Sequence, residues 1–220
     1  MKSSDILTTV GSAASLFLTV FSICKPGDKA IVISPNFPAA IDVLIALQLN
    51  VQMLKLKFEN GFQVDVDELS AMVDEKVKFI SITTPNNPTG VLTPNHKIKS
   101  IVEIIKAKSP TCKLFVDETY RDAAYGDSAI EPSAATVDPA VISISSLSKA
   151  LGAPGLRIGW LITKDKELLK KLAIAKMNVF ICCSNVDEFL AIALLKRKSE
   201  FLAKQKVSFT VTFHVYFLSF

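Results

Sequence analysis

The sequence predicts an α/β protein, a three-layer α/β/α sandwich built around a mostly parallel sheet. Short runs of apolar, often β-branched residues recur along the 220-residue chain, and longer patterns with helical spacing separate them. The runs are apolar throughout and do not alternate with polar residues. Such strands are buried on both faces, which requires helices on both sides of the sheet. Six runs are expected to be strands: 30–34, 51–56, 77–82, 113–117, 140–145 and 157–163.

The first element is the uncharged stretch 6–24, which has the length of a signal peptide or a membrane span. It contains several serines and threonines and a glycine, and no cleavage site of the A-x-A type follows it. It ends in KPGDKAIVIS, a helix stop that leads directly into a strand. These features favour one buried helix over 6–24.

Helical patterns then follow over 37–50 and 93–109. The second is expected to begin with Thr93 as its N-cap and Pro94 at its first position. From Lys164 onward the pattern is mainly helical. The last fourteen residues, 207–220, are aromatic, almost uncharged and strand-like, and we expect them to be foreign to the domain.

Composition excludes several function classes. Only three of the 25 basic residues are arginines, which is a poor set for reading phosphates or base edges, so no nucleic-acid partner is expected. The four cysteines form no CxxC pair and there are only two histidines, so the sequence contains no zinc spacing and no metal is expected. The cysteines are expected to be buried free thiols in a reducing compartment, the cytoplasm.

Polar residues that could take part in catalysis or binding follow the ends of the predicted strands. Asn87 lies beyond 77–82, and Asp117 closes 113–117. Ser146 and Lys149 lie beyond 140–145. In parallel sheets, ligands bind outside the carboxyl ends of the strands. We therefore expect the functional site at this edge of the sheet.

The stretch SISSLSKALGAPGLRIGW, 143–160, indicates what that site binds. Lys149 stands between an apolar strand and a Gly/Pro-rich loop, where partial desolvation would favour the neutral amine, which reacts with carbonyls. Arg157, Ser146 and Ser148 add donors suited to a phosphate. A lysine for an aldehyde beside a phosphate clamp indicates pyridoxal phosphate (PLP). Asp117 would keep the pyridine nitrogen protonated, although it is equally suited to capping a following helix.

Four motifs carry a resemblance to a known family. NNPTG, DETY, SLSK and GLRIGW, in this order and spacing, resemble the large domain of class I/II PLP-dependent aminotransferases of fold type I. Upstream, VGSAASLFL resembles the family's phosphate-binding turn and helix, and CKPGDKAIVISPNFP resembles its next strand and stacking aromatic residue. The resemblance covers about 6–200 and implies a PLP-binding large domain there, with 1–5 and 207–220 as atypical ends. It also implies that 6–24 is neither a signal nor an anchor.

The resemblance implies a role for each matching residue. Lys149 would bond covalently to the cofactor and move the proton between the substrate carbon and the cofactor. Asp117 would pair with the pyridine nitrogen, and Tyr120 and Asn87 would bond the phenolic oxygen of the ring. The remaining cofactor contacts would be the backbone amides of Ser12 and Ala13, the side chains of Ser146, Ser148 and Arg157, and the stacked ring of Phe37.

Departures from the family pattern limit what the resemblance implies. Ala13 stands where the family often has Thr or Ser, which removes one hydrogen bond to phosphate, worth about 1 kcal/mol. The family's N-terminal segment and C-terminal small domain match nothing in this sequence. The small domain supplies the arginine that grips the substrate carboxylate, and neither Arg121 nor Arg197 matches it by motif. A truncated chain is therefore expected, with an exposed apolar patch and poor solubility.

The implied activity is transfer of an amino group between an amino acid and a 2-oxo acid. The family is typically dimeric, so the full-length form is expected to be a homodimer, with no membrane association. Two alternatives remain open. The same core motifs serve other PLP reactions, such as those of lyases and decarboxylases, and the unmatched substrate clamp allows a chain without catalytic activity.

Overall fold

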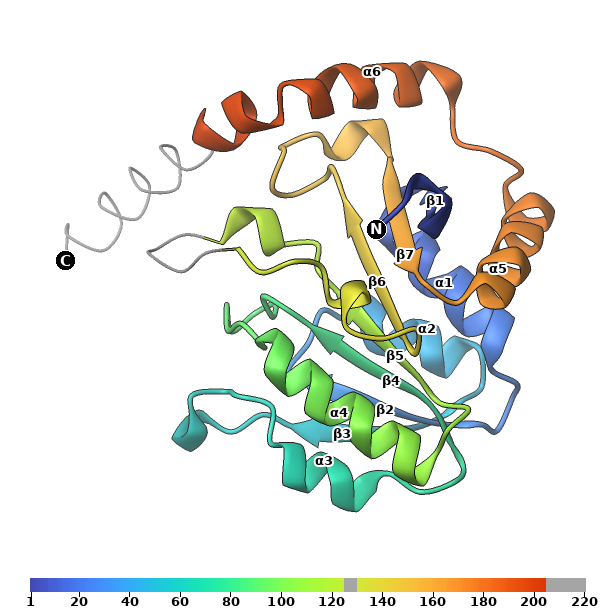
Figure 1. Cartoon of the computed structure of the whole chain (residues 1–220), viewed down its shortest axis with the longest axis vertical. Helices are drawn as coiled ribbons and strands as arrows, with labels where there is room; N and C mark the ends of the chain where they lie inside the picture. Colours follow the sequence, from blue (N-terminus) through green and yellow to red (C-terminus); the bar gives the residue numbers. More distant parts are fainter. Residues whose placement is uncertain (125–129, 205–220) are drawn as a thin grey trace.

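The computed structural model describes residues 1–124 and 130–204, which fold around one seven-stranded sheet (Figure 1). The strand order is β1-β7-β6-β5-β4-β2-β3. From β3 to β6 all neighbours are parallel, whereas β7 runs antiparallel to both β6 and β1. The strands are β1 (Ile6–Thr9), β2 (Lys29–Ser34), β3 (Asn50–Lys55), β4 (Val77–Thr83), β5 (Lys113–Asp117), β6 (Val141–Ser146) and β7 (Gly159–Thr163). The prediction of a mostly parallel α/β sheet is confirmed.

Helices cover both faces of this sheet, as the apolar strands require. The side chains of β5 show the division, because Leu114 and Val116 belong to one core cluster and Phe115 to the other. The first cluster lies under α3 and α4, and the second under α1, α2 and α5. The helices are α1 (Gly11–Ile23), α2 (Ala39–Ala46), α3 (Val66–Met72), α4 (Asn95–Lys108), α5 (Lys166–Val179) and α6 (Asn185–Lys196). The three-layer sandwich is therefore confirmed.

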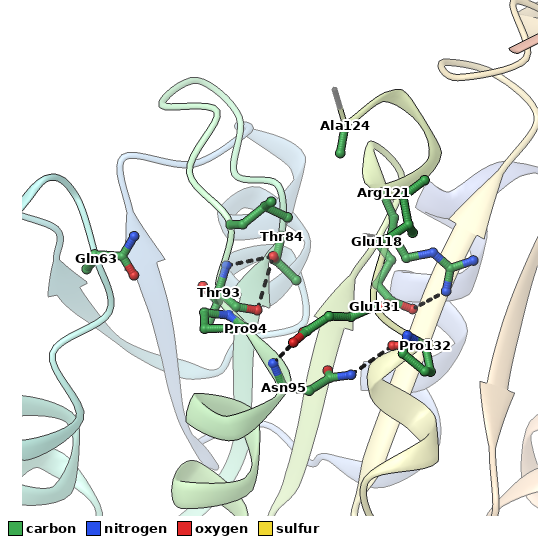
Figure 2. A pocket seen from close by; sticks show the side chains of 12 residues that line it. Gln63, Thr84, Thr93, Pro94, Asn95, Glu118, Arg121, Ala124, Glu131 and Pro132 are labelled. Atoms are coloured by element: carbon green, nitrogen blue, oxygen red, sulfur yellow. Dashed lines mark hydrogen bonds and ion pairs between the residues drawn. The ribbon is translucent and has the colours of Figure 1, made fainter. Parts of the chain in front are cut away.

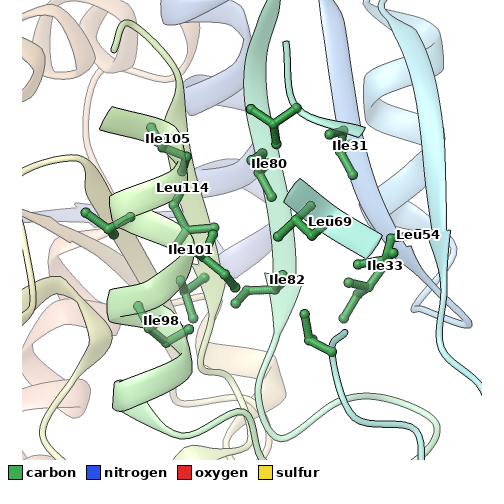
Figure 3. Close-up of a cluster of buried hydrophobic side chains, with 14 of the residues drawn as sticks. Ile31, Ile33, Leu54, Leu69, Ile80, Ile82, Ile98, Ile101, Ile105 and Leu114 are labelled. Atoms are coloured by element: carbon green, nitrogen blue, oxygen red, sulfur yellow. The ribbon is translucent and has the colours of Figure 1, made fainter. Parts of the chain in front are cut away.

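The α4 face illustrates how the sequence produces this packing. Ile98, Ile101 and Ile105 recur at helical spacing, are fully buried, and meet Ile80 and Ile82 of β4 (Figure 3). Burial of an isoleucine side chain stabilises the fold by about 1.5–3 kcal/mol. The charged residues of α4 lie on its other side, so one helix face is held by the hydrophobic effect.

The N-terminal stretch differs from its prediction. Instead of one helix over 6–24, residues Ile6–Thr9 form β1, which pairs with β7, and the helix begins only at Gly11. Gly11 has a φ of 77°, a left-handed conformation that ends the strand and turns the chain into α1. Pairing with β7 satisfies backbone groups that would otherwise lie open at an edge strand, a long-range gain that helical periodicity does not reveal.

Two other boundaries also differ. The fourth helix begins at Asn95, because Thr93 donates its backbone N–H to Thr84 Oγ1 (2.8 Å) and a distant carboxylate, Glu131, accepts the Asn95 N–H (2.6 Å). The predicted strand 157–163 begins only at Gly159. The short helix α3 was not predicted at all.

Of the remaining expectations, the tail 207–220 lies outside the described residues. Within residues 1–124 and 130–204, no helix combines the length and the apolar character needed to cross a bilayer. Large apolar side chains are exposed on α6 and the loop before it, among them Ile181, Val186 and Phe189. Their exposure is consistent with the expected apolar patch, and poor solubility stays a prediction.

Candidate functional site

A small hollow of about 40 Å³ opens where β4 and β5 end, beside the first turn of α1. Four residues singled out from the sequence line it together: Ser12, Ala13, Phe37 and Asp117. They come from three segments far apart in the chain, the start of α1, the turn after β2 and the end of β5. The parallel strands bring these segments together because their carboxyl ends lie at one edge of the sheet.

Asp117 lines this hollow from the end of β5. Its Oδ1 accepts a hydrogen bond from the backbone N–H of Thr119 (2.9 Å), so the alternative of a local cap is realised in part. Burial raises the pKa of Asp117, and the hydrogen bond from the Thr119 N–H only opposes that shift. Among the described residues, no lysine, arginine or histidine forms an ion pair with it. A half-buried acid with a raised pKa favours a proton or a ligand atom that carries one.

The first turn of α1 and the guanidinium of Arg157 lie together next to this hollow. A Cβ on Gly11 would stand 2.5 Å from Nη2 of Arg157, so the guanidinium lies directly against the helix start. The first turn has no acidic residue and no side-chain cap, which leaves its N–H groups available. Free N–H groups at a helix start, beside a guanidinium, are a binding site for phosphate.

Gly159 and two serines complete this site. A Cβ on Gly159 would stand 2.6 Å from the Gly11 carbonyl carbon, so only glycine lets β7 approach the start of α1. Arg157 donates to Ser148 Oγ (3.4 Å) and to a backbone carbonyl, and Ser148 donates its N–H to Ser146 Oγ (3.3 Å). The structure therefore brings together all the residues that the sequence suggested for the phosphate.

Three predicted residues are not joined to the hollow by contacts. Lys149 is exposed, so the expectation that it is desolvated is wrong for this structure. Tyr120 precedes a short helical turn, Arg121–Ala123, and Asn87 is half-buried. Among the described residues, none of these three side chains forms a hydrogen bond, and none lines the hollow. Their roles stay predictions.

Sequence reasoning missed several buried polar groups near the carboxyl ends of β2, β4 and β5. Four buried side-chain atoms lack a hydrogen-bond partner in the described structure: Asn36 Nδ2, Asn86 Oδ1, Thr119 Oγ1 and Arg121 Nε. Asn36 precedes Phe37 and accepts a hydrogen bond from Thr83 Oγ1 (3.0 Å), and Thr119 follows shortly after Asp117. Buried polar atoms are rarely left unpaired, so such a group beside a hollow indicates a ligand. The sequence offered one signal for three of them: Asn36, Asn86 and Thr119 lie within two positions of the predicted site residues Phe37, Asn87 and Asp117.

The donor set fits PLP. The hollow presents an acid for a protonated ring nitrogen and an aromatic face at Phe37, and the start of α1 with Arg157 presents donors for a phosphate. Across 1–124 and 130–204, no three His, Cys, Asp or Glu side chains gather as a metal site would require.

Comparisons with known proteins agree with this geometry. A sequence profile of the family described as aminotransferase class I and II matches residues 1–210. The tyrosine aminotransferase of Dictyostelium discoideum is 27% identical over 168 residues, 76% of this chain and 40% of that protein. The cystine lyase of Arabidopsis thaliana is 29% identical over 169 residues, 76% of this chain and 39% of that protein.

Solved structures give the same result for the fold. A PLP-dependent aminotransferase from Streptococcus suis 89-1591 superposes with a TM-score of 0.83 at 28% identity, over 91% of this chain and 52% of its own. The chain thus spans about half or less of the length of these three proteins. The profile match covers most of the sequence and includes all four motifs. The chain therefore belongs to the class I and II aminotransferase family.

Proposed function

We propose that this chain forms the PLP-binding domain, residues 6–200, of an enzyme that transfers an amino group between an amino acid and a 2-oxo acid. One observation carries the proposal. The half-buried Asp117, which forms no ion pair within the described residues, shares a hollow with Ser12, Ala13 and Phe37, and the guanidinium of Arg157 lies beside it against Gly11. A ligand that carries a protonated ring nitrogen and a phosphate would satisfy Asp117 and the donors at Arg157 and Gly11 at the same time.

When bound, PLP supplies an electron sink that stabilises negative charge on the substrate carbon. Asp117 would hold the proton on the ring nitrogen, and burial supports this role because it raises the affinity of the carboxylate for a proton or a cationic partner. Phe37, whose side chain is largely exposed at the hollow, would cover one face of the ring and exclude water.

The phosphate would be held by the first-turn N–H groups at Ser12 and Ala13, with the guanidinium of Arg157 and the hydroxyls of Ser146 and Ser148. Ala13 contributes no hydroxyl. The exposed amine of Lys149 would attach the cofactor and carry a proton at Nζ to and from the substrate carbon. Asn87 and Tyr120 would donate to the phenolic oxygen of the ring.

Substrates and partners belong to this proposal as well. The substrates would be an amino acid and a 2-oxo acid, and the functional form a homodimer, by analogy with the family. All four cysteines are free thiols, which supports a reducing compartment such as the cytoplasm.

A visible absorption scan of the purified chain with added PLP tests the cofactor site. The wild type should develop a new band that Lys149→Ala lacks, and Asp117→Asn should weaken binding without removing covalent attachment. A Lys164→Ala variant, which changes a lysine on the loop after β7, is the matched control and should behave as the wild type. An unchanged band in Lys149→Ala would contradict the assignment of the lysine, and no band in the wild type would favour a chain without catalytic activity.

A second candidate is a PLP-dependent lyase, and the identity with the cystine lyase of Arabidopsis thaliana favours it. The two reactions differ in their need for an acceptor. If the PLP-loaded protein is an aminotransferase, an amino acid alone should release no more keto acid than there is bound PLP, because the amino group stays on the cofactor, and continued release should require a 2-oxo acid acceptor. Turnover of cystine with no acceptor would instead identify a lyase.

A further inference from the structure

Asp117 and its neighbour Glu118 face opposite sides of the sheet. Asp117 lines the small hollow, whereas Glu118 lines a larger cavity of about 370 Å³ behind it, near the start of α4 (Figure 2). At the end of β4 the neighbours Thr83 and Thr84 divide between the two cavities in the same way. Because side chains alternate across a strand, the two cavities lie back to back.

Glu118 is held firmly on its own side. Its side chain is 6% exposed, and its Oε2 accepts hydrogen bonds from Ser133 Oγ (2.6 Å) and from Ser143 Oγ. Its Oε1 accepts from the backbone N–H of Ala134 (3.0 Å), and Arg121 Nη1 lies 3.6 Å from Oε2. Figure 2 shows the Arg121 guanidinium turned toward this carboxylate. One side chain therefore joins the end of β5 to β6 and to the short helical turn Ala134–Thr136.

Backbone hydrogen bonds act beside these side-chain contacts on the segment that aims Asp117. The N–H of Glu118 donates to the carbonyl of Ile144 on β6 (2.9 Å), and the carbonyl of Asp117 accepts the N–H of Thr84 (2.8 Å). Asp117 Oδ1 is bonded only to the Thr119 N–H, one residue beyond Glu118. The direction of the Asp117 carboxylate thus depends on the backbone at 117–119, which Glu118 fixes.

We propose that Glu118 is a positioning residue, which holds the Asp117 carboxylate toward a ligand in the small hollow from the opposite face of the sheet. The proposal rests on the proposed function for the identity of that ligand, the ring of PLP. A catalytic group has to be held within a fraction of an ångström by groups that are themselves fixed, and Glu118 has the contacts to do this. Its negative charge also acts on Asp117, since burial first and then this neighbouring charge raise the pKa of Asp117.

Two conservative changes test the proposal without emptying the core. Glu118→Gln keeps the shape and an acceptor for the Ala134 N–H but removes the charge. A double variant, Ser133→Ala with Ser143→Ala, keeps the charge but removes both hydroxyl donors. Glu131→Gln is the matched control, because Glu131 lines the same larger cavity but binds the start of α4, whereas Glu118 binds β6 and the turn Ala134–Thr136. Thermal unfolding of each variant establishes that it is folded.

Two readouts report on Asp117 directly. In the chain without PLP, the pH titration of its carboxyl carbon is followed by ¹³C NMR, with Asp117→Asn to assign the signal. In the chain loaded with ¹⁵N-labelled PLP, the ¹⁵N shift reports protonation of the ring nitrogen, and absorption titration gives the Kd. A purely structural role for Glu118 would lower the unfolding temperature and leave these signals unchanged.

We expect Glu118→Gln to lower the midpoint of the Asp117 titration. We expect the double serine variant to displace that midpoint and to weaken PLP binding roughly tenfold, about the loss of one hydrogen bond to a charged group. Glu131→Gln should change neither. Folded variants with a wild-type Asp117 titration would overturn the proposal. If the wild type binds no PLP, the proposed function fails, but the titration without PLP still decides the role of Glu118.

Discussion

The guanidinium of Arg157 lies against Gly11 so closely that a Cβ on that glycine would be 2.5 Å from Nη2. Arg157 reaches this position with a left-handed φ of 47° at the end of a short turn, and it donates to Ser148 and to the carbonyl of Pro154 (2.8 Å). The start of a helix is itself electropositive, so a cation there is unfavourable until an anion binds between them. This contact supports the proposal that Arg157 and the start of α1 bind a phosphate.

Inorganic phosphate should therefore stabilise the chain, and Arg157→Ala should abolish that effect. Binding to the folded state alone raises the unfolding free energy by RT ln(1 + [L]/Kd), about 2.7 kcal/mol at a hundredfold excess over Kd. The measurement is the unfolding temperature in phosphate and in chloride at equal ionic strength. Arg197→Ala, which changes an exposed arginine paired with Glu200, is the control. An undiminished phosphate effect in Arg157→Ala would contradict the anion site.

Gly159→Ala should damage the same site from the side of β7. The new Cβ would lie 2.6 Å from the Gly11 carbonyl carbon and 2.8 Å from the Ser12 nitrogen, both backbone atoms that cannot move independently. We expect a loss of about 1–3 kcal/mol in unfolding free energy, typical of overpacking, and weaker PLP binding. Gly155→Ala is the control, because its Cβ would have no atom within 4 Å. Urea unfolding of both variants decides the matter, and equal stabilities would show that β7 can shift.

Asp117→Asn should stabilise the chain without PLP at neutral pH while weakening PLP binding. Burial raises the pKa of Asp117 above its usual 3.8, so the folded state binds more protons than the unfolded state between these two values. Stability in the wild type therefore falls as the pH rises through that window. The advantage of Asp117→Asn should be absent below pH 3.8 and grow as the pH rises. Unfolding temperatures across a pH series measure it, and a pH-independent difference would show that the buried carboxylate is not its cause.

The four cysteines should differ sharply in reactivity. Burial raises the pKa of Cys112 to about 12, and it does the same for the half-buried Cys24. Cys182 is exposed, which corrects the expectation that all the thiols are buried. A thiol reagent at pH 8 should label Cys182 first, because reaction requires both a thiolate and access. Peptide mass mapping over time gives the order, and Cys182→Ser should remove the fast phase. Rapid labelling of Cys112 in the folded chain would contradict its burial.

The sequence alone determined the layers of the fold and the edge of the sheet at which the candidate site lies. Apolar runs such as 77–82 and 113–117 are buried on both faces, and this local pattern predicts helices on both sides of a parallel sheet. The motifs also predicted which residues would lie together at the proposed phosphate site, because Arg157, Ser146 and Ser148 stand close together in the chain. Asp117 and Ser12 line the same hollow in the folded chain. The resemblance to the family had already assigned both residues to one cofactor.

Only the tertiary structure decided the rest. The pairing of Ile6–Thr9 with β7, and the start of α4 at Asn95 with Glu131 as its distant partner, depend on contacts between segments far apart in sequence. The Glu118 contacts with Ser133 and Ser143 are of the same kind, because each donor lies on a different element. Hydrophobic periodicity records which face of a segment is buried, and it carries no information about which polar group a buried side chain will meet.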